Sequence, residues 1–243
     1  MITVFASLSA YVTGRLAGQK AASALVTELV KRGAAAADIP ELLQPALAGA
    51  LTLHRLAALY STTLQVDGGG TRIAVTRSRH LYEAEKSGAD VWVTVDDDVE
   101  ASERTLRWLV EAVTSDSEPR VCVAPCLLRE SSVANVEWHP LYLTRRLEGG
   151  GKARRIIRAG FGLVAVNRKA MKLVSERSSL FRDSDGQLKP TAFLETYDAD
   201  TQRWHGEDSS FFRRLPEAVL SEALVTGETG HGGAALDFQT LDG

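Results

Sequence analysis

Short apolar runs rich in β-branched residues alternate along the chain with longer stretches in which apolar residues recur every three or four positions. The short runs are typical of strands buried inside a sheet, and the longer stretches are typical of helices with one apolar face. This alternation predicts an α/β domain whose mostly parallel central sheet is flanked by helices. The predicted strands are residues 2–6, 91–95, 121–124 and 162–166, and the predicted helices are residues 15–31, 73–86, 167–174 and one that follows Ser102.

Two segments fit this pattern less well. Residues 34–59 are rich in Ala and Leu and contain Pro40 and Pro45, so we expect short helices there. Residues 145–158 hold three consecutive glycines among six Lys or Arg residues and one Glu, which predicts a mobile basic loop. A loop of this kind can close over an anionic ligand, and the alternative is a loop whose charges are simply solvated.

Composition excludes several classes of protein and leaves the function open. The 243 residues are 44% hydrophobic and 24% charged, which is the balance of a chain that buries a core. The formal net charge of -3 gives no global indication of binding to nucleic acid or to an anionic membrane. Cys122 and Cys126 match neither a disulfide framework nor a zinc knuckle, so we expect buried, reduced thiols. No apolar run is long enough to span a bilayer, and we expect a cytoplasmic protein.

Three consecutive aspartates, Asp96, Asp97 and Asp98, follow the predicted strand at 91–95. Because that strand is apolar on both faces, its carboxyl end should lie at the edge where open α/β sheets bind ligands. Carboxylates gathered there suit a hard divalent cation, Mg²⁺ or Mn²⁺, that bridges them to a diphosphate. The alternative is a solvated acidic turn beside the helix that starts near Ser102, because acidic residues are favoured at a helix N-terminus.

Four short motifs, in this order, resemble those of GT-A-fold glycosyltransferases of the family-2 type. VTVDDDVEAS at 93–102 resembles the DxD motif, GFGLVAVNRKAM at 160–171 the glycine-containing strand and helix, WHGEDSSFFRRL at 204–215 the xED motif, and GHGG at 230–233 the C-terminal metal-binding histidine. The resemblance implies one GT-A-like, Rossmann-like domain over residues 1–243. Its nucleotide-sugar-binding part would be residues 1–125, and its acceptor-binding part residues 126–243.

The resemblance also implies an activity and a set of site residues. The protein would transfer a sugar from a nucleotide diphosphate sugar, with a UDP-sugar as the expected donor and Mn²⁺ or Mg²⁺ as cofactor. An inverting reaction follows if Asp208 is the general base that deprotonates the acceptor. The donor would be bound by Ser7, Arg79, Asp96, Asp97, Gly160 and Gly162, the acceptor by Trp204, His205 and Glu207, and the metal by Asp98 and His231.

The sequence departs from the family in two places. Ser78, Arg79 and His80 stand where relatives often read Ala-Arg-Asn, and segment 34–59 is longer than the usual link between the first two strands. Each candidate also has a structural alternative: Glu207 or Asp208 as a helix cap, Ser7 as a plain loop serine, His231 as a surface residue, and Trp204 as a core residue.

Three other functions remain open. The acceptor can be a modified base in DNA, which combines the glycosyltransferase with a nucleic-acid partner. A nucleotidyltransferase also arranges aspartates around a metal and a triphosphate, but it releases pyrophosphate instead of a nucleoside diphosphate. A non-catalytic nucleic-acid-binding module would use the basic residues of 145–158, and its DNA affinity would fall steeply with salt.

Overall fold

The computed structural model describes residues 1–10, 27–28, 32, 47–68, 73–127, 134–141, 143–231 and 234–237. The predicted helix at 15–31 and the first part of segment 34–59 fall outside the described residues, apart from isolated positions. The described helices are α2 (Leu47–Leu59), α3 (Ile73–Ser87), α4 (Glu103–Thr114), α5 (Arg168–Arg177) and α6 (Glu207–Arg214). Within the described residues, no helix is both long and apolar enough to cross a membrane.

The strands form one large sheet and three small ones. The strands of the large sheet are β1 (Thr3–Ala10), β2 (Ser61–Gly68), β3 (Val91–Asp96), β5 (Arg120–Val123), β6 (Val136–Trp138), β7 (Thr144–Arg146), β8 (Lys152–Ala159), β9 (Leu163–Asn167) and β14 (Leu220–Leu224). The small sheets pair β10 (Leu180–Arg182) with β11 (Leu188–Pro190), β12 (Thr196–Asp198) with β13 (Arg203–His205), and β4 (Val99–Ala101) with β15 (Glu228–His231) and β16 (Ala234–Asp237).

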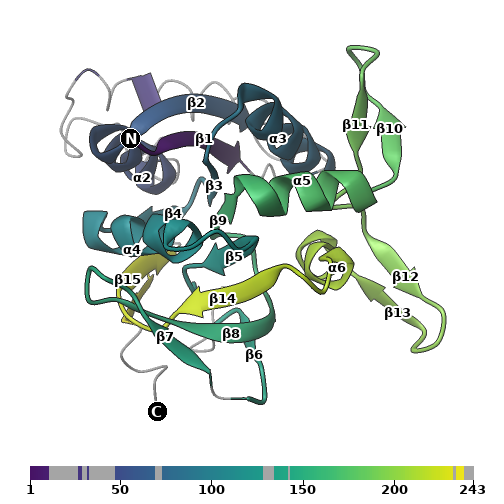
Figure 1. The fold of residues 1–243 in the computed structure, drawn as a ribbon. Helices are drawn as coiled ribbons and strands as arrows, with labels where there is room; N and C mark the ends of the chain where they lie inside the picture. The colour runs from purple at the N-terminus through teal and green to yellow at the C-terminus, as the bar shows by residue number, and fades with distance from the viewer. Residues whose placement is uncertain are drawn as a thin grey trace.

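The large sheet has nine strands in the order β2-β1-β3-β9-β5-β14-β8-β6, with β7 added beside β8. Strands β9 and β8 run against their neighbours, and the other strands of this sheet share one direction. The prediction of a mostly parallel sheet flanked by helices is therefore confirmed. Strands from both the first and the second half of the chain lie side by side in it (Figure 1).

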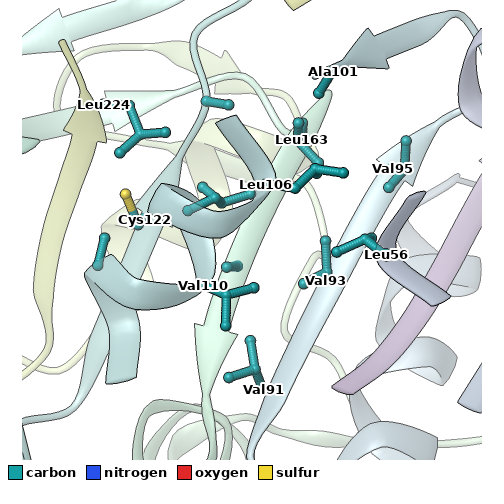
Figure 2. Packing of buried hydrophobic residues seen from close by; sticks show 14 of the residues in the cluster. Leu56, Val91, Val93, Val95, Ala101, Leu106, Val110, Cys122, Leu163 and Leu224 are labelled. Atoms are coloured by element: carbon teal, nitrogen blue, oxygen red, sulfur yellow. The ribbon is translucent and has the colours of Figure 1, made fainter. Parts of the chain in front are cut away.

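Alternation along the central strand β3 separates the core into two layers, one on each face of the sheet. Val91, Val93 and Val95 pack in the cluster that includes residues of α2 and α4 (Figure 2), whereas Trp92 packs with residues of α3, α5 and α6. Burying one such valine stabilises the fold by roughly 1.5–3 kcal/mol. Cys122 and Cys126 are reduced and buried, as predicted, and burial raises the pKa of the Cys126 thiol to about 12.

Side chains at the start of two helices fix where each helix begins. Ser102 Oγ accepts a hydrogen bond from Thr105 N at 3.2 Å and caps α4, as predicted from the sequence. Asn167 caps α5 in the same way, through a bond of 3.0 Å from Ala170 N. The first cap places α4 directly after the acidic turn and β4.

The prediction that residues 145–158 form a mobile basic loop is wrong. They form the antiparallel hairpin of β7 and β8, and Gly150 turns the chain with a φ of 84°. Ala153 and Ile156 point into the core, Arg154 and Arg155 between them are half-buried, and the Arg154 guanidinium lies 4.9 Å from the centre of the Trp138 ring. Arg145 binds the buried Glu222 through two hydrogen bonds of 3.2 and 2.6 Å. The strand was missed because glycines and charged residues dominate this segment and only its few inward-facing positions are apolar.

Helix α2, from the Ala/Leu-rich segment, packs against the acidic turn at residues 97–98. Gly49 N donates a hydrogen bond of 3.0 Å to Asp97 O, and a Cβ at Gly49 would lie 2.9 Å from Asp97 Cα and 2.5 Å from Leu8 Cδ1. Thr52 Oγ1 donates to Val99 O at 3.1 Å and accepts from Ala101 N at 3.0 Å. This close approach holds the turn and β4 in place.

We predict that Gly49→Ala destabilises the protein by about 1–3 kcal/mol, because the added methyl group overpacks the contact between α2 and the acidic turn. At an unconstrained helical position the same change stabilises a protein by up to about 1 kcal/mol. Urea unfolding of the variant measures the difference. Ala57→Ser, on the exposed face of α2, is the control and should change stability by well under 1 kcal/mol. A more stable Gly49→Ala protein would contradict the packing described here.

Candidate functional site

Arg77 of α3 joins carboxylates from two distant parts of the chain. Its Nη2 donates to both oxygens of Asp96, at 2.9 and 3.1 Å, and its Nη1 donates to Asp208 Oδ1. Nη1 also lies 3.5 Å from Glu207 Oε1. Asp96 ends β3 and Asp208 lies in the first turn of α6, so this one guanidinium brings the DxD-like and xED-like motifs together.

Burial makes these ion pairs strong and also shifts the pKa values of their members. The Arg77 side chain is 2% exposed. Burial disfavours its charge, but the facing carboxylates of Asp96 and Asp208 outweigh this effect and raise its pKa above the ordinary value. Burial raises the pKa of Asp96 to about 6, and Arg77 opposes that rise. Burial and the nearby Asp208 raise the pKa of Glu207.

Asp208 is held from two sides. Besides the ion pair with Arg77, its Oδ2 accepts a hydrogen bond of 3.1 Å from the backbone N of Phe161, in the loop between β8 and β9. The Arg77 guanidinium lies 5.4 Å from the centre of the Phe161 ring. The alternative in which Glu207 or Asp208 caps α6 does not describe the helix, whose N-cap is Gly206 without a side-chain hydrogen bond. The Asp208 carboxylate is therefore fixed by tertiary contacts.

The C-terminal motif lies next to the acidic turn. Strand β15 pairs with β4 in antiparallel register, so the backbone of His231 lies opposite Val99, the residue that follows Asp98. The His231 side chain, Gly232 and Gly233 fall outside the described part of the structure. Asp97 is 7% exposed, and Asp98 is half-buried. Val99, which directly follows Asp98, is thus paired with His231, 132 residues further along the chain.

Gly160 and Gly162, both predicted to bind the donor, lie where a Cβ atom would come too close to neighbouring side chains. A Cβ on Gly160 would lie 2.4 Å from Asn135 Nδ2, and one on Gly162 would lie 3.3 Å from both Cys126 Sγ and Val99 Cγ2. Gly162 O also accepts a hydrogen bond of 2.8 Å from Asp96 N. These glycines allow the β8–β9 loop to pack against the end of β3 and position Phe161 between them.

Two residues predicted to bind the donor have structural partners away from the Arg77 cluster. Ser7 was expected just after the first strand, but β1 continues to Ala10, and the fully buried Ser7 Oγ accepts a hydrogen bond of 2.9 Å from Trp92 Nε1. Arg79 Nε donates to Asp183 Oδ2 at 2.6 Å, which ties α3 to the turn between β10 and β11. Arg79 therefore anchors that hairpin in this structure.

The predicted acceptor residues precede or begin α6. Trp204 is 72% exposed on β13, and its ring centre lies 5.3 Å from that of Tyr197 on β12, so it is not a core residue. His205 is half-buried, and Glu207 opens α6. Trp204 and Glu207 flank His205 and the Gly206 cap. The β12–β13 hairpin, which carries Tyr197 and Trp204, therefore directly precedes Asp208 in the chain.

Arg77 itself was missed from the sequence, and helical periodicity contains the signal that would have found it. Arg77, Leu81 and Ala84 are spaced by four and three positions, and all three are buried on the inner side of α3. An arginine in an apolar stripe needs carboxylate partners, because an unpaired buried charge is costly. The family resemblance drew attention to Arg79 instead, two positions further along the helix.

The carboxylates at the acidic turn can hold a divalent cation only if oxygen atoms of the substrate complete its coordination. Among the residues with described side chains, no group of three His, Cys, Asp or Glu is arranged to hold a metal ion. Asp96 and Asp208 are engaged by Arg77, and Asp98 is a half-buried carboxylate directly before β4, the strand that pairs with β15. A hard cation that keeps few protein ligands and takes the rest from phosphate and water fits this arrangement.

Comparisons with known proteins bear on the fold alone. No protein-family model and no curated protein match the chain. The solved structure of A197 from STIV is similar, with a TM-score of 0.50 and 17% identity, over 98% of this chain and 91% of that one. A glycosyltransferase involved in glycosylation of the major capsid of PBCV-1 has a TM-score of 0.33 and 11% identity, over 69% of this chain and 62% of that one. A putative glucose-1-phosphate thymidylyltransferase from Bacillus anthracis has a TM-score of 0.39 and 13% identity, over 98% of this chain and 93% of that one. The TM-scores of these two transferases are below 0.5, so neither structure supports a conclusion about this chain.

We predict that the Asp96 carboxyl group titrates with a midpoint near pH 6 in the metal-free protein, because burial raises its pKa. The folded pKa lies above the ordinary 3.8, so this group alone stabilises the folded state increasingly as the pH falls from about 6 to about 4. Carbon-13 NMR of the labelled aspartates measures the midpoint. A midpoint near 4 would contradict this prediction and show that the ion pair with Arg77 offsets the effect of burial.

We predict that Arg77→Met lowers the free energy of unfolding by about 3 kcal/mol, because it leaves the half-buried carboxylates of Asp96 and Asp208 near each other without a cation. Chemical denaturation measures the loss, and the Asp96 midpoint should move to higher pH. Arg79→Met is the matched control on the same helix. It should loosen the β10–β11 hairpin and leave the Asp96 titration unchanged. Equal effects of both variants on Asp96 would contradict the central position of Arg77.

Proposed function

We propose that the chain is a metal-dependent glycosyltransferase that moves a sugar from a nucleotide diphosphate sugar to an acceptor. The observation that carries this proposal is the cluster of Arg77, Asp96 and Asp208. It joins two motifs that resemble DxD and xED at the carboxyl end of a buried strand, where α/β sheets bind ligands. If Asp96 only belonged to a solvated turn and Asp208 only capped a helix, neither role would require the two carboxylates to bind the same arginine.

The donor side of the proposed site is the acidic turn. Asp96 would face the nucleotide ribose of a UDP-sugar, and Asp97 would support the sugar or the metal. Asp98 and His231 would hold Mn²⁺ or Mg²⁺, and the antiparallel register of β4 and β15 supports this pairing. Such a cation, when bound, neutralises charge on the diphosphate as a Lewis acid.

Asp208 is the proposed general base. The acceptor oxygen forms its bond to the anomeric carbon as the bond from that carbon to the diphosphate oxygen breaks, and the acceptor proton passes to the Asp208 carboxylate. Attack on the face opposite the leaving group inverts the anomeric centre. Arg77 and the Phe161 N–H act as positioning groups, because they orient the carboxylate without touching the acceptor.

The rival functions differ in product or partner. A nucleotidyltransferase built on the same acidic turn would release pyrophosphate, and a glycosyltransferase releases a nucleoside diphosphate. A modified base in DNA is the alternative acceptor within the proposal. The nucleic-acid-binding module loses support, because residues 145–158 form a hairpin in which Arg145 is engaged by Glu222. A cytoplasmic location stays a prediction from the sequence.

We predict that Asp208→Asn lowers turnover by a factor of about 10² to 10⁴ and leaves donor affinity nearly unchanged, because the amide keeps the shape of the side chain but cannot accept the proton. A thermal-shift screen of UDP, GDP and dTDP with and without Mn²⁺ first identifies the nucleotide. Release of the nucleoside diphosphate under single-turnover conditions then measures the chemical step.

Glu207→Gln, the adjacent residue in the same helical turn, is the control for Asp208→Asn and should retain most of the turnover. Transfer by Asp208→Asn at the wild-type rate would exclude Asp208 as the base. Loss of donor binding would assign it to the donor site instead. Release of pyrophosphate from a nucleoside triphosphate by the wild-type protein would favour the nucleotidyltransferase.

A further inference from the structure

A pocket of about 360 Å³ lies beside α6 and is not part of the Arg77 cluster. It is bordered by β6, β8, β13 and α6, and Figure 1 shows α6 between the β12–β13 hairpin and β8. Ile157 and Phe212 supply its apolar part. Its polar lining is Glu137, Arg158, Thr201, Arg203, His205 and Arg213.

The charge of this pocket favours an anion. Arg158 is paired with Glu137, and Arg213 Nη2 binds Asp198 Oδ2 at 2.7 Å. Arg203 is exposed, and no carboxylate partner is found for it in the described part of the chain. Two carboxylates thus balance two of the arginines and leave one guanidinium available. A guanidinium presents parallel N–H groups that match the oxygens of a phosphate or carboxylate.

His205 adds an unmet hydrogen-bonding group to the same pocket. Its Nε2 atom is buried, with no hydrogen-bond partner among the described residues, and the nearest carboxylate oxygen, Asp198 Oδ2, is 3.7 Å away. A buried polar atom without a partner costs free energy, so such atoms usually indicate a ligand or water that the protein is built to hold. An anionic oxygen in the pocket would receive bonds from both His205 and Arg203.

The pocket lies close along the chain to the proposed base. Asp208 follows His205 by three residues, a stretch that spans at most about 10 Å. Phe212 lines the pocket one helical turn after Asp208. A small molecule that fixes its anion in the pocket can therefore bring a hydroxyl group towards the Asp208 carboxylate.

We infer that this pocket binds a phosphate-type anion, and, if the proposed function holds, that the anion belongs to a small hydroxyl-bearing acceptor. The acceptor would be held by charge at Arg203 and His205 and by apolar contact with Ile157 and Phe212. The anion site is independent of metal and donor, and its binding can be measured without turnover.

Calorimetric titration of the metal-free, donor-free protein with inorganic phosphate tests the anion site. We expect saturable binding that weakens at least tenfold in Arg203→Ala and in His205→Ala. Arg146→Ala, which removes an exposed arginine of β7 outside the pocket, is the control and should bind phosphate as the wild type does. Non-saturable binding, or equal affinity in Arg203→Ala, would overturn the site.

The second arm assigns the source of the anion. Glycerol phosphate should accelerate nucleoside diphosphate release from the donor by the wild type. Arg203→Ala should remove that acceleration, and the control Arg146→Ala should keep it. Tighter binding of a DNA oligonucleotide than of glycerol phosphate, lost in Arg203→Ala, would replace the small acceptor by a nucleic-acid backbone and overturn the assignment. If donor turnover is absent altogether, the proposed function fails, and the phosphate titration still decides the pocket.

Discussion

The arrangement of the site depends on one buried guanidinium. Arg77 can lose its hydration only because Asp96 and Asp208 meet it, and the two carboxylates can approach each other only because Arg77 lies between them. The cost of an unpaired charge in this position is several kcal/mol, which is a large part of the stability of a typical domain. Helices α3 and α6 and the end of β3 are therefore held in a single relative position.

A second set of contacts holds the acidic turn from the other side of the sheet. Helix α2 approaches it through Gly49 and Thr52, and β15 pairs with β4 immediately after it. None of these contacts uses the carboxylate oxygens of the turn. The backbone of the turn is thus fixed through contacts that do not involve its carboxylates, and a fixed backbone is the support that a ligand-binding group needs.

The sequence predicted those features of the fold that neighbouring residues determine, and it missed those that depend on residues far away in the chain. The apolar run of β3 and the serine cap of α4 could be read directly, because both are set by neighbouring residues. The role of Arg77 could not, because its partner Asp208 lies 131 residues away. The hairpin at 145–158 was misread for a related reason: Arg145 is paired with Glu222, which lies 77 residues away and which local composition does not reveal. The family resemblance joined the distant motifs and drew attention to Arg79 of α3, but it did not indicate Arg77.

The sequence separation within the Arg77 cluster also has a consequence for synthesis of the protein. When the ribosome has produced the first 125 residues, Arg77 and Asp96 exist, but α6 and the strands β8, β9 and β14 do not. A nascent chain of this length would have to bury the Arg77 guanidinium with only one of its two carboxylate partners, Asp96. The edge of β3 that later pairs with β9 would also be exposed. We therefore expect late, cooperative folding, in which the first half of the chain stays vulnerable to proteases and chaperone binding until α6 leaves the exit tunnel.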